Sequence, residues 1–121
     1  MSADNCIFCK IIGSEESEKT VVFENDAVIA IKPRDEVAQG HTLVIPKEHH
    51  RDIFDIPAQS LKELIVVSQQ LAKSLTEKYR ASGVNILHAS GADAGQSVFH
   101  FHIHVVPRYP DDGLDLWLKE K

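Results

Sequence analysis

Residues 96–108, QSVFHFHIHVVPR, constrain the fold of this chain more than any other stretch. Three of the seven histidines, His100, His102 and His104, occupy alternate positions, and the residues between them are aromatic or β-branched. Such alternation is typical of a half-buried strand. Because successive side chains of a strand point to opposite faces, the three imidazoles would share one face, roughly 7 Å apart per two residues. The segment therefore predicts a strand that turns its apolar residues to the core.

The remaining sequence predicts four more strands and one main helix. Strand-like runs cover residues 20–25, 27–32, 40–46 and 84–90, with the histidine run as a fifth strand at 97–106. The helix would begin near Pro57 and end at Gly83. Its apolar residues at helical spacing are Leu61, Leu64, Ile65, Leu71 and Leu75. This order predicts an α+β fold with a mostly antiparallel sheet, in one domain spanning residues 1–121.

The N- and C-terminal segments carry weaker structural signals than the rest of the chain. The opening residues predict a short helical or irregular segment that ends near Gly13, and residues 109–121, which carry the only tryptophan, are expected to dock on the domain. The N-terminus lacks a long apolar segment, and no run of about 18 apolar residues occurs, so we expect neither a signal peptide nor a membrane span.

The composition narrows the classes of partner and compartment. A net charge of −5 argues against a protein that binds nucleic acid through a basic face, although a local site for a small anion remains compatible with it. The two cysteines lie in a single C-x-x-C, too few for a disulfide framework. We therefore expect a cytoplasmic protein with reduced thiols.

Three roles compete for the histidine face. The histidines could be solvated or packed without a chemical task, or H-x-H could ligate a catalytic zinc ion. The catalytic zinc hypothesis lacks a carboxylate on the same strand, and the sequence contains no H-E-x-x-H. In the third hypothesis a neutral imidazole attacks a phosphoryl-type group, while its neighbours, with Ser97 and Gln96, donate hydrogen bonds to the phosphate oxygens.

The pattern His-φ-His-φ-His-φ-φ at residues 100–106, where φ is apolar, resembles the motif of the histidine-triad (HIT) family. AGQSVFHFHIHVVPR, GHTLVIPKEHH and the opening CIFCKII resemble bacterial members, in the expected order and over nearly the whole chain. The chain is thus similar to bacterial nucleotide hydrolases of this family that carry an N-terminal C-x-x-C zinc motif. The resemblance implies the HIT-like fold, with a sheet of about five strands, one main helix and a short N-terminal helix.

The resemblance also implies a mechanism. In HIT proteins the central histidine attacks the α-phosphorus of a nucleotide derivative, and water then hydrolyses the nucleotidyl-histidine. The match makes His102 the nucleophile and places His104 against the phosphate and the leaving-group atom. By the same match, Ser97 and Gln96 would bind phosphate oxygens or the departing group. Phe8 and Ile31 match residues that line the base pocket, although either could be a core residue as well.

The C-x-x-C of Cys6 and Cys9 leaves no room for the preceding strand of a thioredoxin-like motif, so a structural zinc fits better and requires two further ligands. In HIT proteins and the related galactose-1-phosphate uridylyltransferases, these are a histidine after the V-I-P-K strand and the first histidine of the triad. Here the resemblance implies His49, with His50 as the alternative, and His100. A free dithiol, with His100 only hydrogen-bonded, is the competing interpretation.

Two positions depart from the family pattern. Many relatives have A-F-x-D-x-x-P after the second strand, where the aspartate holds the ribose; this chain has Pro33 there, and Asp35 follows two residues later. Many relatives also have N-N-G before the Gly-rich turn, where this chain has Ala89 and Ser90. Asp35 and Ser90 are therefore the candidates to replace the missing contacts with the nucleotide.

The resemblance predicts a hydrolase that cleaves at the α-phosphorus of nucleoside 5′-phosphoramidates or related nucleoside phosphates, such as derivatives of AMP or GMP. Hydrolysis of dinucleoside polyphosphates is the nearest alternative, since it presents an α-phosphate to the same nucleophile. A nucleotide-binding regulatory or scaffold protein with little turnover is the alternative of another class. Similar family members form homodimers through a continuous sheet, and we expect the same of this chain.

Overall fold

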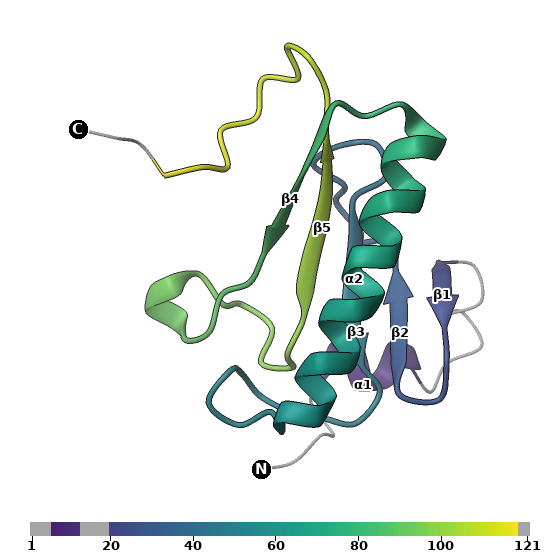
Figure 1. The fold of residues 1–121 in the computed structure, drawn as a ribbon. Coiled ribbons are helices and arrows are strands. Elements are labelled where there is room, and N and C mark those ends of the chain that lie inside the picture. The colour runs from purple at the N-terminus through teal and green to yellow at the C-terminus, as the bar shows by residue number, and fades with distance from the viewer. Residues whose placement is uncertain (1–5, 13–19, 119–121) are drawn as a thin grey trace.

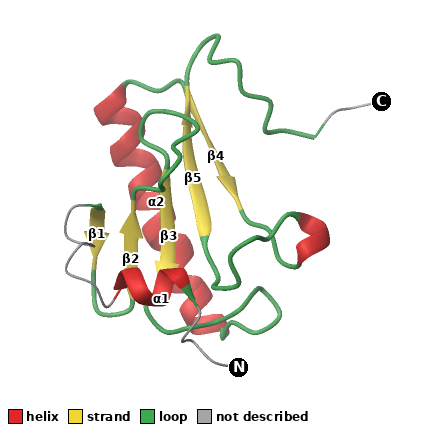
Figure 2. Cartoon of the chain, turned by 180° about the vertical axis from the view of Figure 1, so that it is seen from behind, coloured by secondary structure: helices red, strands yellow, loops and turns green. Residues whose placement is uncertain are grey.

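The computed structural model describes residues 6–12 and 20–118 of the chain. Five strands form one antiparallel sheet in the order β1-β2-β3-β5-β4, which confirms the predicted α+β class. A long helix, α2 (Ala58–Tyr79), covers one face of the sheet, and the short helix α1 (Ile7–Ile12) lies on the other (Figures 1 and 2). The strands are β1 (Val21–Glu24), β2 (Val28–Ile31), β3 (Thr42–Pro46), β4 (Gly83–Leu87) and β5 (Ile103–Arg108).

The central strands β2 and β3 are buried along their whole length because the sheet has a helix on each face. Alternate side chains supply two separate apolar clusters. The cluster under α2 includes Val28, Val44 and Phe101, whereas the cluster under α1 includes Phe8 and Leu43. The sheet therefore separates the core from a second apolar layer, and the histidines lie on the α1 side.

Helix α2 differs from the sequence prediction in two respects. Its buried face consists of Leu64, Val67, Ser68, Leu71 and Leu75, with Leu61 packed at its margin. Ile65, which was predicted to face the core, is 49% exposed, because it lies one residue, about 100°, around the helix from Leu64. The helix also ends before Gly83, since Arg80 takes the left-handed conformation (φ 56°) and caps it.

The C-terminal segment is fixed at its base by Arg108. The Arg108 guanidinium donates to both carboxylate oxygens of Asp112, at 2.8 and 2.9 Å, and to the Leu114 carbonyl at 2.7 Å. Beyond this point the chain runs outward past β4 (Figure 1), and Trp117 is 70% exposed. The expected docking of the tail is therefore wrong for Trp117. Within residues 6–12 and 20–118, no helix has the length and apolar character to cross a membrane.

Candidate active site and metal centre

The histidine segment is extended, but it is only partly a strand. The predicted strand 97–106 begins at Ile103, since β4 pairs with β5 up to the Leu87–His104 pair and then turns away into the Gly-rich loop. Residues 97–102 therefore have no β4 partner. The predicted alternation nevertheless holds: Phe101 and Ile103 lie in the apolar cluster under α2, and the histidines lie on the opposite side.

His102 has its tautomer set by the backbone. Its Nδ1–H donates to the carbonyl of His100 at 2.8 Å, which leaves the lone pair on Nε2. The ring of Phe8 packs edge-on against it, with the ring centroids 5.2 Å apart. Burial lowers the pKa of His102, so the imidazole is neutral near pH 7. A neutral imidazole with a fixed lone pair on Nε2 is a competent nucleophile.

His104 has the opposite tautomer to His102, because His41 fixes the position of its proton. The backbone N–H of Val37 donates to Nδ1 of His41 at 3.2 Å, so His41 carries its proton on Nε2. That proton is donated to Nδ1 of His104 at 3.0 Å, and His104 must therefore carry its own proton on Nε2. Burial and the nearby His102 and His41 rings lower the pKa of His104 to about 4. His104 is thus a neutral donor, with its ring centroid 5.1 Å from that of His102.

His41 contacts the histidine triad through His104, and the sequence analysis did not identify it as a candidate site residue. It is 4% exposed and immediately precedes β3, and burial lowers its pKa. Gly40 places it there: a Cβ at Gly40 (φ 90°) would lie 2.9 Å from the Tyr79 ring, so only glycine allows this approach. The one available signal was a histidine at the start of a strand that is apolar apart from Thr42.

The two residues predicted to bind phosphate oxygens, Ser97 and Gln96, differ in exposure. Ser97 is exposed and follows Gln96, which is buried. The Gln96 amide donates to the carbonyls of Arg51 and Val98, at 2.8 and 3.1 Å, and its oxygen accepts the Gly91 N–H at 2.7 Å. The side chain of Gln96 therefore braces the Gly-rich loop against its neighbours.

The candidates for nucleoside contacts also differ in their surroundings. Phe8 and Ile31 are both buried in the apolar cluster under α1, and Phe8 alone of the two has a ring contact with the histidines. Asp35 is exposed in the loop between β2 and β3. Ser90 is half-buried and bonds to His88 and to the N–H of Ile53. The structure thus brings Phe8 to His102 and leaves Asp35 on the surface.

Four side chains form a potential metal site: Cys6, Cys9, His49 and His100. Their ligand atoms all lie within 4.8 Å of one another. Nδ1 of His100 is 3.2 Å from the Cys6 sulfur and 3.4 Å from the Cys9 sulfur, and Nδ1 of His49 is 3.3 Å from the latter. Ligand atoms around a tetrahedral zinc ion are separated by about 3.3 to 3.8 Å, so the four residues fit one metal ion.

Hydrogen bonding supports the same assignment. Nε2–H of His100 donates to the carbonyl of Pro46 at 2.8 Å, which directs the lone pair on Nδ1 toward the two sulfurs. Burial and the adjacent Cys6 thiol raise the pKa of Cys9 to about 11, so this thiol loses its proton readily only when a cation is present. His49, and not the alternative His50, belongs to the cluster.

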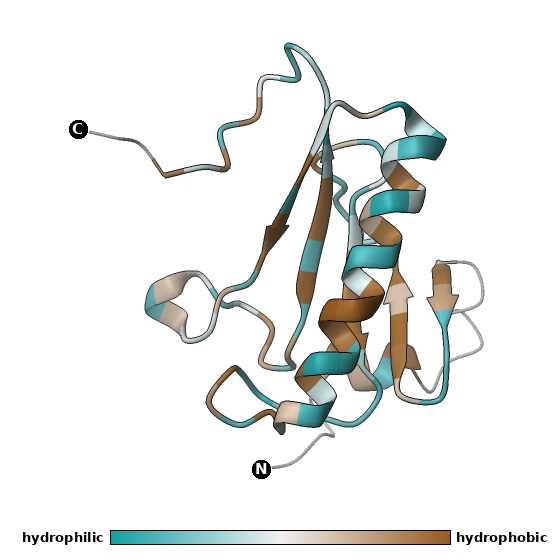
Figure 3. Cartoon of the chain, in the orientation of Figure 1, coloured by the Kyte–Doolittle hydropathy of each residue, from teal (hydrophilic) through white to brown (hydrophobic). Residues whose placement is uncertain are grey.

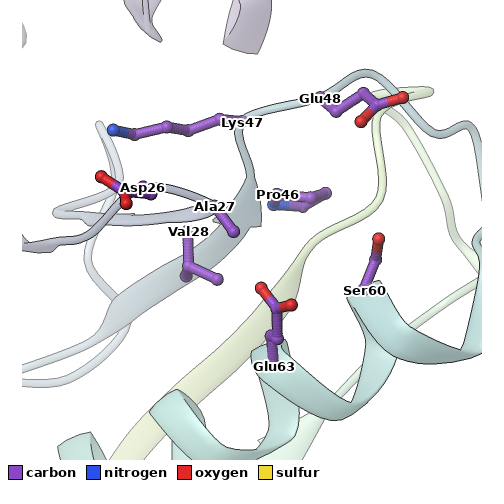
Figure 4. A pocket seen from close by; sticks show the side chains of 8 residues that line it. All are labelled: Asp26, Ala27, Val28, Pro46, Lys47, Glu48, Ser60 and Glu63. Atoms are coloured by element: carbon purple, nitrogen blue, oxygen red, sulfur yellow. The ribbon is translucent and has the colours of Figure 1, made fainter.

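A cavity of about 360 Å³ lies on the α2 side of the sheet, opposite the histidines. Figure 4 shows the carboxylates of Asp26, Glu48 and Glu63 around it, with Ser60 and Lys47 at its rim. Lys47 is itself paired with Glu24 at 2.6 Å. None of the candidate site residues lines this cavity.

Comparison with known proteins agrees with this geometry. The chain is 41% identical to Protein hit of Bacillus subtilis, over 88% of this chain and 73% of that protein. It superposes on the crystal structure of a HIT family protein from Bacillus anthracis with a TM-score of 0.87 and 38% identity, covering 98% of this chain and 84% of that one. A Zn-bound histidine triad family protein from Mycobacterium smegmatis has a TM-score of 0.84 and 33% identity, covering 99% and 86%. The family model described as the HIT domain matches residues 14–111, and the chain therefore belongs to the HIT family.

Proposed function

We propose that this protein hydrolyses nucleoside 5′-phosphoramidates or related nucleoside phosphates by attack of His102 on the α-phosphorus. The observation that carries the proposal is the pairing of two neutral imidazoles with opposite tautomers. His102 offers a lone pair on Nε2, and His104 beside it offers a proton on Nε2. One ring is thereby equipped to attack phosphorus and the other to donate a hydrogen bond to the oxygens that gain charge.

The reaction divides into two displacements at phosphorus. In the first, Nε2 of His102 forms a bond to phosphorus while the bond to the leaving amine breaks, and the amine takes one proton from solvent. The nucleotidyl-imidazolium keeps its Nδ1–H on the carbonyl of His100. In the second, water attacks phosphorus, the bond to His102 breaks, and the proton of the water returns to solvent. The two steps together consume one water molecule and regenerate the neutral imidazole.

His104 acts in this scheme as a neutral donor. Its Nδ1 accepts the proton of His41, and the Val37 N–H prevents His41 from reversing its tautomer. A second proton on His104 would sit on Nδ1 and face the Nε2–H of His41, so two donors would meet without an acceptor. The Nε2–H of His104 remains available to a phosphoryl oxygen or the leaving-group atom throughout the reaction, with Ser97 at the exposed side as a further donor.

The test uses a fluorogenic adenosine 5′-phosphoramidate and, in parallel, a diadenosine polyphosphate, each with the wild type and with His102→Ala. We expect turnover of the amidate by the wild type, a nucleotidyl-protein trapped by a rapid alkaline quench and detected by mass spectrometry, and loss of both in the variant with AMP affinity retained. A preference for the dinucleotide would support the alternative hydrolase. Full turnover by His102→Ala would refute the mechanism, and AMP binding without any turnover would favour a regulatory or scaffold protein.

A zinc ion held by Cys6, Cys9, His49 and His100 is proposed as a structural element. The four residues are positioned to bind a metal, and thiolate with imidazole is the donor set that zinc prefers. The ion would tie α1 to the extended segment that precedes β5, at His100, two residues before the nucleophile. Cysteines that ligate a metal instead of forming a disulfide suit a reducing compartment, which supports the cytoplasm as the location.

A homodimer is proposed through β4 and α2, with residues 1–121 forming a single domain in each copy. β4 is an edge strand; its Ile86 is 40% exposed, and Ile65 and Val66 on the adjacent α2 are 49 and 50% exposed. They line an apolar hollow of about 370 Å³, and hydrophobic colour marks the middle of α2 and much of β4 in Figure 3. A second copy placed edge to edge would satisfy the free backbone groups of β4 and cover this patch.

A further inference from the structure

The backbone of the nucleophile lacks one of the neighbours that a strand residue normally has. β4 and β5 are paired as far as Leu87 and His104, and β4 then leaves the sheet. The carbonyl of His102 is nevertheless satisfied, because Nδ1–H of the His88 side chain donates to it at 2.9 Å. His88 is the first residue after β4, so its side chain takes over where the backbone ladder stops.

Two further contacts fix the His88 ring. It stacks on Phe101, with the ring centroids 4.3 Å apart and the planes inclined by 25°. Its Nε2 accepts the hydroxyl proton of Ser90, and the Ser90 oxygen accepts the N–H of Ile53 at 2.9 Å. A chain of hydrogen bonds thus runs from the loop between β3 and α2, through Ser90 and His88, to the nucleophile's carbonyl. Ser90, one of the two positions at which the sequence departs from N-N-G, is a member of this chain.

The position of the attacking atom, Nε2 of His102, depends on the backbone of residues 100–102. The His102 ring is held by a hydrogen bond to the carbonyl of His100, so its orientation follows the path of residues 100–102. A displacement of about 1 Å at a reacting atom can cost on the order of a hundredfold in rate. We propose that His88 is a positioning residue that aims Nε2 of His102 by holding the His102 carbonyl. This inference rests on the proposed nucleophilic role of His102.

Two substitutions distinguish the contributions of the two ring nitrogens of His88. In His88→Asn the side-chain amide reaches the place of Nδ1, so a donor to the His102 carbonyl is kept while the ring and the Ser90 contact are lost. In His88→Gln the amide reaches the place of Nε2 instead, and the His102 carbonyl loses its donor. Ser82→Ala is the matched control, because it removes a side-chain hydrogen bond to the Arg108 carbonyl at the opposite end of β4 and leaves His88 intact. His88 and Ser82 are exposed, so all three variants are expected to fold, and their Tm values verify it.

We expect His88→Gln to lower kcat for the phosphoramidate about tenfold, with KM nearly unchanged, since one hydrogen bond of this kind corresponds to roughly that factor. His88→Asn should retain kcat within about threefold, and the control Ser82→Ala likewise. Equal losses of kcat in His88→Asn and His88→Gln would overturn the inference, as would unchanged kcat in both. A loss confined to KM would assign His88 to substrate binding and overturn it as well.

Amide hydrogen exchange measures the same effect without turnover. His88→Gln should speed exchange in a peptide covering residues 99–104 about fivefold, whereas His88→Asn should not, and a peptide from α2 provides the internal reference. Unchanged exchange in His88→Gln would overturn the inference. If the wild type cleaves no nucleotide at all, the proposed function fails, but the exchange experiment still decides whether His88 holds the nucleophile segment.

Discussion

Acidification is expected to destabilise this protein through His104. The folded protein holds this imidazole neutral, because it is partly buried and its Nδ1 already accepts the proton of His41. The pKa of His104 is about 4 in the folded protein, against 6.5 for an unperturbed histidine. Between these values the unfolded chain binds a proton that the folded protein does not, so the free energy of unfolding falls as the pH falls from 6.5 toward 4.

The magnitude follows from the difference in pKa. Each pKa unit corresponds to about 1.4 kcal/mol, so the full difference would approach about 3 kcal/mol. His104 is partly exposed, and screening by solvent reduces the expected effect to about 2 kcal/mol. The variant His104→Asn isolates this contribution, because its side-chain oxygen lies at the place of Nδ1, still accepts the His41 proton and does not titrate.

Urea denaturation at 25 °C, repeated at intervals from pH 7.5 to 4.5, measures the difference. The free energy of unfolding of the wild type should fall more steeply than that of His104→Asn below pH 6.5, and the two curves should run parallel above it. Ser97→Ala, which alters an exposed residue without a titrating group, should follow the wild type. Parallel curves for the wild type and His104→Asn over the whole range would refute the assignment of a neutral, depressed His104.

Three other outcomes test the remaining proposals. Chelation should first lower the Tm and expose two reactive thiols, whereas immediate loss of turnover at an unchanged Tm would indicate a catalytic metal. Ile65→Lys should convert the dimer into a monomer, as measured by light scattering, because it places a charge in the apolar patch beside β4. A monomeric wild type would contradict the proposed dimer interface. Arg108→Gln should speed chymotryptic cleavage at Trp117, since Arg108 fixes the tail through Asp112 and the Leu114 carbonyl, and an unchanged rate would show that this contact does not order the tail.

Apolar runs for the strands and a spacing of 3.6 residues for the helix were sufficient to predict the α+β class. The apolar runs of β2 and β3 and the spacing in α2 predicted the elements, and their order implied an antiparallel sheet with one main helix. Ile65 and Gly83 were misassigned because both assignments depend on tertiary contacts. For Ile65, a helix with two apolar stripes does not reveal which stripe the sheet covers. For Gly83, the residue at which the helix ends is decided by how the next strand is placed.

The sequence by itself determined the alternating triad, the C-x-x-C and hence the chemical types present at the site. Only the tertiary structure decided which nitrogen of each histidine carries the proton. That choice depends on partners far along the chain: His104 takes its tautomer from His41, and the His102 carbonyl takes its donor from His88. It also selected His49 over His50 for the metal cluster. A neutral imidazole has two tautomers of similar energy, so its role is set by the nearest fixed donor or acceptor, which local sequence does not specify.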